Sequence, residues 1–262
     1  MSTLTSCSPS PKDVVTIPSK AIEVVPSTST TQASLLSSVA KTLGSMLICV
    51  VVYMYLWPWQ IAVGFVMLIF FHEMGHVLAM KYYRLRASPP IFVPFLGAII
   101  DLKEDPPNAK VEAIVGIGGP ILGTLAALVC YAVWWQTQSP IFLALAFWGF
   151  LLNLFNMTPV PPLDGGRITA AISPWIWMIG FAVLLGFIVQ GIAVKTVSPL
   201  LLVLAVYATP RVWRTLRGRE RMGDYYNIPK SASRWIAITY LALGVVLVIC
   251  FLQTRDLVNF GR

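Results

Sequence analysis

Charged side chains are scarce in this sequence. Only 11% of its 262 residues are Asp, Glu, Lys or Arg, whereas 57% are hydrophobic; an average soluble domain has about a quarter charged residues. Between Glu112 and Lys195 the charged side chains are Asp164 and Arg167 alone. The formal net charge of +8 would suit a nucleic-acid partner only if it were spread over a polar surface. The composition therefore excludes a soluble nucleic-acid-binding protein and indicates a polytopic membrane protein.

The sequence also lacks a disulfide framework and an apolar leader. Its four cysteines form no Cys-x-x-Cys pair, so we expect small buried or lipid-facing side chains. Residues 1–40 are rich in Ser, Thr and Pro and contain no hydrophobic core of a signal peptide. Such a segment buries too little apolar surface to offset the entropy lost on ordering. We therefore predict a disordered cytoplasmic tail over 1–40 and a membrane domain over 41–262.

Apolar windows suited to crossing a bilayer recur along the rest of the chain. Seven windows, of which the sixth is short, predict an all-α protein with six or seven transmembrane helices. They are 43–57, 60–80, 113–135, 141–160, 174–194, 197–210 and 235–253. With the tail inside, 16 of the 19 Lys and Arg residues fall on the cytoplasmic side, in agreement with the positive-inside rule. Because no other targeting feature is visible, we expect a multi-pass protein of a prokaryotic inner membrane.

Two proline-rich segments interrupt the helical pattern. The apolar stretch 91–102 is too short to cross the bilayer, so we expect a re-entrant or interfacial element of two short strands that turn at Gly97. The segment 158–166 reads T-P-V-P-P-L-D-G-G; its prolines prevent helix continuation and its glycines allow tight turns. Irregular backbone at membrane depth is tolerated where it is buried in protein. We therefore expect this segment to fold back against the helices.

The chain has only two histidines, and they stand four residues apart in the second apolar window. The sequence H-E-M-G-H puts His72 and His76 on one helix face, where both imidazoles can bind one metal ion. Glu73, between them, is well placed to address a metal-bound water. This pattern also arises by chance in soluble proteins. A carboxylate within a membrane-spanning helix, however, costs at least about 2.5 kcal/mol and marks a functional site.

A catalytic zinc ion usually has three protein ligands and a water, so two histidines leave one ligand to be found. Most nearby acids lie in the polar loop over 101–105, and Glu112 suits the start of a helix. Asp164 is embedded in apolar sequence, although it could instead cap a helix that begins near Arg167. We favour Asp164 as the third ligand because the adjacent glycines allow close approach of the backbone and the topology puts it at the depth of the histidines.

The two motifs together resemble a known family. H-E-M-G-H at 72–76, combined with N-M-T-P-V-P-P-L-D-G-G at 156–166, resembles the site-2 protease family of intramembrane zinc metalloproteases. The segments P-F-L-G-A at 94–98 and G-G-P at 118–120 are also similar to family segments. The resemblance extends over roughly residues 60–175.

The resemblance implies a site, a cofactor and a substrate class. It implies one zinc ion per chain, held by His72, His76 and Asp164, with Glu73 as general base and proton shuttle. It further implies that Asn156 helps to position or polarise the substrate carbonyl, beside a membrane-associated sheet that could hold an unwound substrate by strand addition. The substrates would be transmembrane proteins, cleaved within or near the bilayer in regulated intramembrane proteolysis.

The sequence departs from the family pattern at one segment and leaves two other functions open. The family segment G-P-x-x-N appears here as G-P-I-L-G at 119–123, without the Asn, so we interpret its glycines as helix packing. A metal-ion or proton transporter is one alternative, since intramembrane His, Glu and Asp also mark ion pathways. A non-catalytic relative that binds membrane proteins is the other. No inverted repeat is visible, and all four motif residues are retained, which favours the protease.

Overall fold

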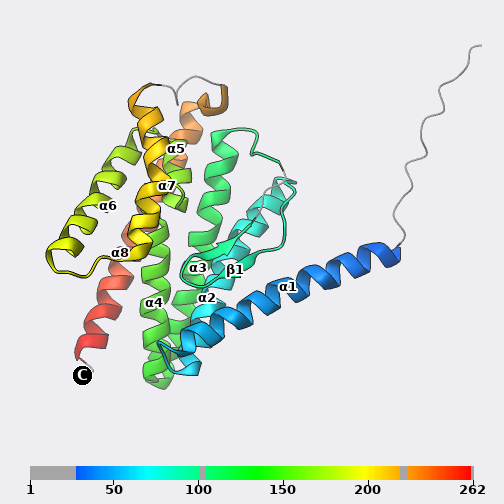
Figure 1. Cartoon of the computed structure of the whole chain (residues 1–262), viewed down its shortest axis with the longest axis vertical. Helices are drawn as coiled ribbons and strands as arrows, with labels where there is room; N and C mark the ends of the chain where they lie inside the picture. Colours follow the sequence, from blue (N-terminus) through cyan, green and yellow to red (C-terminus); the bar gives the residue numbers. More distant parts are fainter. Residues whose placement is uncertain (1–27, 101–103, 219–223, 261–262) are drawn as a thin grey trace, which may run out of the picture. The chain divides into compact units, whose positions relative to one another are not determined.

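The computed structural model describes residues 28–100, 104–218 and 224–260. Within these ranges the chain is mostly helical, with one small antiparallel sheet. The elements are α1 (Thr28–Met54), α2 (Trp59–Tyr82), β1 (Ile91–Val93), β2 (Gly97–Ile99), α3 (Ala109–Thr137), α4 (Pro140–Asn156), α5 (Asp164–Ala170), α6 (Ile176–Ala193), α7 (Pro199–Leu216), η2 (Asp224–Tyr226) and α8 (Lys230–Phe260) (Figure 1). Each of the seven apolar windows coincides with one of the long helices, so the expected helical membrane architecture is confirmed in outline.

The predicted tail over 1–40 falls mainly outside the described residues, which begin at Thr28. Helix α1 also begins there, so residues 28–40 are helical where the sequence indicated disorder. A helix that is nucleated by an apolar stretch gains one hydrogen bond for each further residue, which favours its extension into the polar segment. The chain divides into two units, Met1–Ser37 and Ser38–Arg262, and all the contacts described below lie within the second.

Among the described residues, five helical segments are long and apolar enough to cross a membrane. They are Leu36–Met54, Trp59–Tyr82, Ala109–Thr137, Ile176–Ala193 and Lys230–Val258. Helix α4 is apolar but has only 17 residues, which corresponds to about 25 Å at 1.5 Å per residue. Helix α7 has 18 residues and carries Arg211 and Arg214 near its end. These helices support an integral membrane protein, and the number of six or seven spans stays a prediction.

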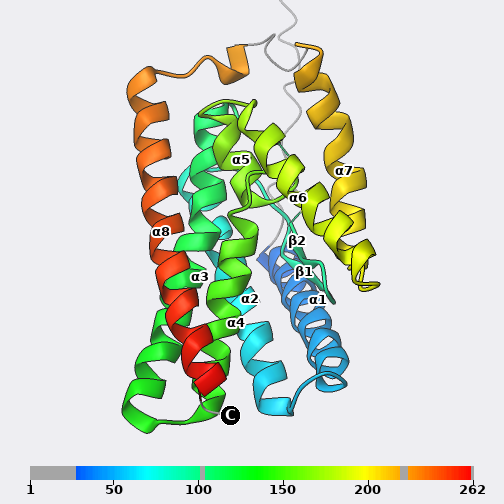
Figure 2. The same ribbon diagram turned by 90° about the vertical axis from the view of Figure 1, so that its left-hand side faces the viewer.

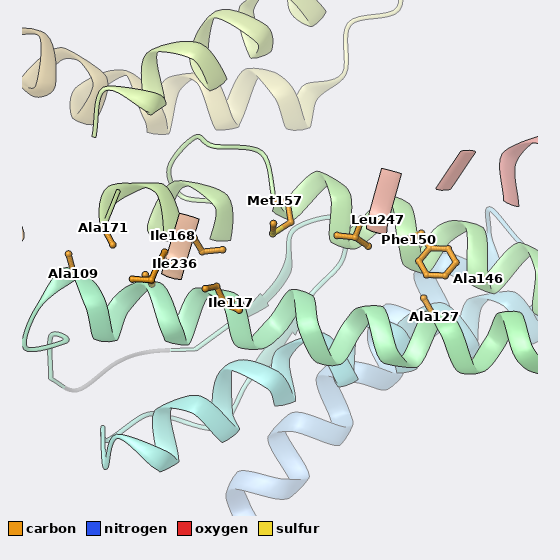
Figure 3. Packing of buried hydrophobic residues seen from close by; sticks show 11 residues of the cluster. Ala109, Ile117, Ala127, Ala146, Phe150, Met157, Ile168, Ala171, Ile236 and Leu247 are labelled. Carbon is orange, nitrogen blue, oxygen red and sulfur yellow. The ribbon is translucent and has the colours of Figure 1, made fainter. Parts of the chain in front are cut away.

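Helix α3 is central to the packing. It contacts α2, α4, α5 and α8, and Figure 2 shows α8 running beside it and α4. The apolar core between these helices consists of the side chains shown in Figure 3: Ala109, Ala113, Ile117, Ala127, Ala146, Phe150, Met157, Ile168, Ala171, Ile236 and Leu247. On the α2 side, Gly75 and Gly118 meet so closely that a Cβ on either would overlap the backbone of the other. This backbone-to-backbone contact brings the histidine-bearing face of α2 against α3.

The two strands form a short hairpin, as the sequence predicts. Ile91 pairs with Ile99 and Val93 with Gly97, so the turn comprises residues 94–96. Gly97 is therefore the first residue of β2 rather than the turn itself. Its φ of 91° lies in the region that glycine adopts at no steric cost, which explains its position beside the turn.

Helix α1 holds this hairpin through three polar contacts to the hairpin backbone. The Thr42 hydroxyl donates to the carbonyl of Pro90 (3.0 Å), and the hydroxyl oxygens of Ser45 and Tyr53 accept from the N–H groups of Phe92 (3.1 Å) and Phe95 (3.0 Å). The three α1 side chains lie on one face of the helix, so α1 fixes the position of β1, the strand nearest to it.

Candidate active site

The two histidines and Asp164 converge in the interior of the protein. His72 and His76 lie one turn apart on the buried face of α2, and Asp164 is the first residue of α5; their exposed fractions are 3%, 6% and 7%. The two Nε2 atoms are 3.3 Å apart, and each faces the Asp164 Oδ2 atom, at 3.1 Å from His72 and 3.3 Å from His76. Among the described residues, these three form the group of His, Cys, Asp or Glu side chains that could hold a metal ion.

The remaining ring nitrogens are held by acceptors. His76 Nδ1 donates to the carbonyl of Val115 in α3 (2.8 Å), and His72 Nδ1 donates to Asn153 Oδ1 in α4 (2.9 Å). The Asn153 amide is oriented by its own Nδ2, which donates to the carbonyl of Gly149 (2.7 Å). Because both Nδ1 atoms carry the proton, a neutral imidazole presents its Nε2 lone pair to the centre of the group. Two such lone pairs and a carboxylate oxygen are ligands that zinc prefers.

Two glycines of α3 leave the space that this group needs. A Cβ at Gly119 would overlap Nε2 of His76 and lie 2.9 Å from Nε2 of His72. A Cβ at Gly123 would overlap Oδ1 of Asn153. The G-P-I-L-G segment thus does more than pack helices, because its glycines face the histidines and the amide that orients His72. The donor atoms and the space beside them fit a single metal ion.

Asp164 does not act as a cap. The N-cap residue of α5 is Leu163, and no side chain caps this helix; the helix begins at Asp164 itself and not near Arg167. The carboxylate is turned instead towards the imidazoles. Its Oδ2 atom lies 3.1 Å from Nε2 of His72 and 3.3 Å from Nε2 of His76, so the carboxylate completes a set of three donor atoms.

Glu73 lies beside the three-residue group and outside it. Its half-buried carboxyl interacts electrostatically with His76, His72 and Asp164, and the backbone N–H of Ala98 in β2 lies within its reach. A carboxylate that does not occupy a ligand position is free to exchange a proton with a water at the group. The contact with Ala98 also brings the outer edge of β2 to the site.

Of the two asparagines in α4, only one contacts a histidine. Asn156 is half-buried at the end of the helix, where its Nδ2 donates to the carbonyl of Leu152 (3.1 Å). Asn153, one turn earlier and 1% exposed, bonds to His72 and was missed by the sequence analysis. The signal was present: α4 is otherwise apolar, so a second amide side chain within it indicates a polar partner.

Parts of the chain are similar in sequence to known peptidases. The model of peptidase family M50 matches residues 60–140, which include α2, the hairpin and α3. A zinc metalloprotease of Methanocaldococcus jannaschii is 28% identical over 106 residues, covering 38% of this chain and 30% of the relative. A probable chloroplastic zinc metalloprotease of Arabidopsis thaliana is 26% identical over 154 residues, covering 41% of this chain and 28% of the relative. The chain thus matches less than a third of the length of either relative. Over the matched residues the chain is therefore similar to peptidase family M50 and to proteins named zinc metalloproteases, which supports the resemblance to the site-2 proteases.

Proposed function

We propose that this protein is an intramembrane zinc metalloprotease that hydrolyses peptide bonds within or near transmembrane segments of other membrane proteins. The observation that carries the proposal is the convergence of two Nε2 atoms and a carboxylate oxygen within the helical core, with a further carboxylate beside them. Zinc is the proposed ion because both relatives are named zinc metalloproteases. His72, His76 and Asp164 are the proposed ligands, with one zinc ion per chain.

Each side chain around the metal group has a proposed role in peptide hydrolysis. Bound zinc would lower the pKa of a coordinated water towards about 7 and polarise the scissile carbonyl. Glu73 then accepts a proton from the attacking water and delivers it to the leaving amide nitrogen. Asn156 is proposed as a donor to the substrate carbonyl, since its amide has a second N–H beside the one that bonds to Leu152.

The hairpin is proposed as the element that receives the substrate. A transmembrane helix hides its carbonyls in hydrogen bonds, so a substrate must unwind before attack. Strand β2 pairs with β1 along one edge, and the N–H of Ala98 is directed towards Glu73 along the other. An extended peptide added to that edge would lie beside the metal group. Replacing Phe92 and Phe95 should then impair cleavage, and unchanged cleavage would count against this step.

The finer points of topology and setting are proposed from charge. With the N-terminus in the cytoplasm, 16 of the 19 basic residues lie on that side of a prokaryotic inner membrane. The three basic residues that remain would lie on the opposite side. A fusion reporter attached at the N-terminus and a second one after α8 should report opposite sides if the chain crosses the membrane seven times.

The experiment that tests the function compares wild type with Glu73→Gln. Purified wild-type protein should contain about one zinc ion per chain, and Glu73→Gln should retain it. Membranes that contain Glu73→Gln should accumulate full-length substrates that wild-type membranes cleave. A zinc or proton transporter would instead move its ion in proteoliposomes without altering any membrane protein. A non-catalytic relative would show the same membrane proteins with either variant, and that result would contradict the proposal.

A further inference from the structure

The segment that delivers Asp164 is held by two side chains from helices that lie beyond the family match over 60–140. Trp177 in α6 donates from its indole Nε1 to the carbonyl of Gly166 at 2.8 Å. Tyr240 in α8 donates from its hydroxyl to the carbonyl of Met157 at 2.6 Å. Both acceptors are backbone carbonyls on the segment between the end of α4 and the first turn of α5. Both donors thus bond to the backbone of this segment and not to the metal-binding side chains.

The carbonyl that Tyr240 holds is in close contact with Gly165, the residue next to Asp164. A Cβ at Gly165 would overlap the carbonyl of Met157, the same carbonyl that accepts from Tyr240. The backbone of Gly165 therefore rests directly on the group that the hydroxyl holds. Gly165 is adjacent to Asp164, so a displacement of the Met157 carbonyl would move the start of α5 and with it the carboxylate.

The contact made by Trp177 holds the first turn of α5 itself, at the carbonyl of Gly166. Trp177 is 2% exposed, and its indole N–H has no access to water in place of the Gly166 carbonyl. Helix α6 also meets the segment at Gly180, where a Cβ would overlap the carbonyl of Pro159. Gly166 lies two residues from Asp164 within α5, so this hydrogen bond fixes the rotation of the first turn of α5.

The histidines do not depend on this segment. They stand on α2 and are oriented by Asn153 and Val115, which lie on α4 and α3. Helix α5 also packs on α3 through the fully buried Ile168. Apolar packing is non-directional, however, whereas a hydrogen bond has a preferred angle and length. The hydrogen bonds from α6 and α8 thus add directional restraints to the segment that carries the third ligand.

We propose that Trp177 and Tyr240 are positioning residues that hold Asp164 against His72 and His76, so that α6 and α8 set the metal affinity without contacting the metal. This inference rests on the metal site of the proposed function. Loss of one ordinary hydrogen bond corresponds to about a fivefold change in an equilibrium constant. Removing the Tyr240 hydroxyl should therefore weaken zinc binding about fivefold.

The test measures zinc affinity in the full detergent-solubilised chain by competition with a chromophoric chelator. Tyr240→Phe is compared with Tyr225→Phe, a matched control that removes a hydroxyl hydrogen bond of 2.7 Å to the side chain of Glu112, which is not part of the segment. Both variants should lower the unfolding temperature of the zinc-free protein, but only Tyr240→Phe should weaken zinc binding. The visible spectrum of the cobalt-loaded protein should also change for Tyr240→Phe alone, because it reports the ligand geometry.

The outcomes separate this inference from the proposed function. Absence of zinc binding in wild type and in Tyr225→Phe would overturn the proposed metal site itself. Zinc bound as tightly by Tyr240→Phe as by wild type, with an unchanged cobalt spectrum, would overturn the positioning role and leave the metal site intact. Should Tyr240→Phe not fold, Trp177→Phe provides the same comparison from α6, with weaker zinc binding expected and wild-type affinity as the contradicting result.

Discussion

Replacing Asn153 with Leu should weaken zinc binding without removing any of the proposed ligands. Leu is close to Asn in shape but cannot accept the proton of His72 Nδ1, which lies 2.9 Å from Asn153 Oδ1. His72 is 3% exposed, so water cannot substitute for the lost acceptor. The imidazole would then turn towards another partner or adopt the tautomer that protonates Nε2, and either change removes the lone pair from the metal group.

The expected loss of zinc affinity can be taken from other metal-binding histidines that lose a hydrogen-bond partner. Loss of a hydrogen-bond partner of a metal-binding His typically lowers metal affinity about 10- to 100-fold, which equals about 1.4–2.7 kcal/mol. The carbonyl of Gly149, which accepts from Asn153 Nδ2, loses a side-chain donor at the same time. We therefore expect some loss of stability as well, of about 1–3 kcal/mol for a buried group left without its partner.

The assay is a zinc competition titration with Asn156→Leu as the control. Asn156 is the other amide of α4, and it bonds to the Leu152 carbonyl rather than to a histidine. Asn156→Leu should bind zinc with wild-type affinity, even though it should lower turnover if its amide contacts the substrate carbonyl. Wild-type zinc affinity in Asn153→Leu would refute the idea that the amide orients His72.

Three further predictions concern the group itself. Gly119→Ala should lose most of its zinc, because the new Cβ would overlap His76 Nε2, whereas Gly186→Ala, where a Cβ meets nothing within 4 Å, should keep it; metal analysis of the purified variants decides this. Asp164→Ala should likewise lose most of its zinc, and full retention would indicate that another residue is the third ligand. Glu73→Gln should retain zinc while the cleavage rate, measured by single-turnover proteolysis, falls about 10²- to 10⁴-fold; an unchanged rate would exclude Glu73 as the base.

Much of the architecture could be predicted because membrane helices obey a one-dimensional rule. A bilayer requires about 20 consecutive apolar residues, and this requirement can be checked on the sequence window by window. The hairpin was also predictable, since a stretch bracketed by prolines is too short to cross. The turn lies at residues 94–96 and not at the predicted Gly97. Its position depends on how the strands pair and on the contacts with α1, which the sequence does not reveal. The start of α1 at Thr28 was not predicted, because a polar composition does not reveal that a neighbouring apolar helix extends into the segment.

The candidate site also has a part that the sequence predicts and a part that depends on the tertiary structure. The spacing of His72, Glu73 and His76 lies within one helix, so the helical repeat alone predicts that the two imidazoles share a face. Asp164 is 92 residues away from His72 and could be chosen from the sequence only through the scarcity of acids, its glycine-rich setting and the family resemblance. Its distance of 3.1 Å from His72 is a result of how α5 folds back against α3.

The sequence by itself determined that the chain is a membrane protein built of apolar helices, with a metal-binding pattern on the second of its apolar windows. These features depend on local composition and on spacing along a single helix. Only the tertiary structure decided that Asn153 orients His72, that Gly119 leaves room at the imidazoles, and that Trp177 and Tyr240 hold the segment of Asp164. Each of these contacts joins different helices, and its existence depends on the distance and angle at which the helices pack, which no local pattern encodes.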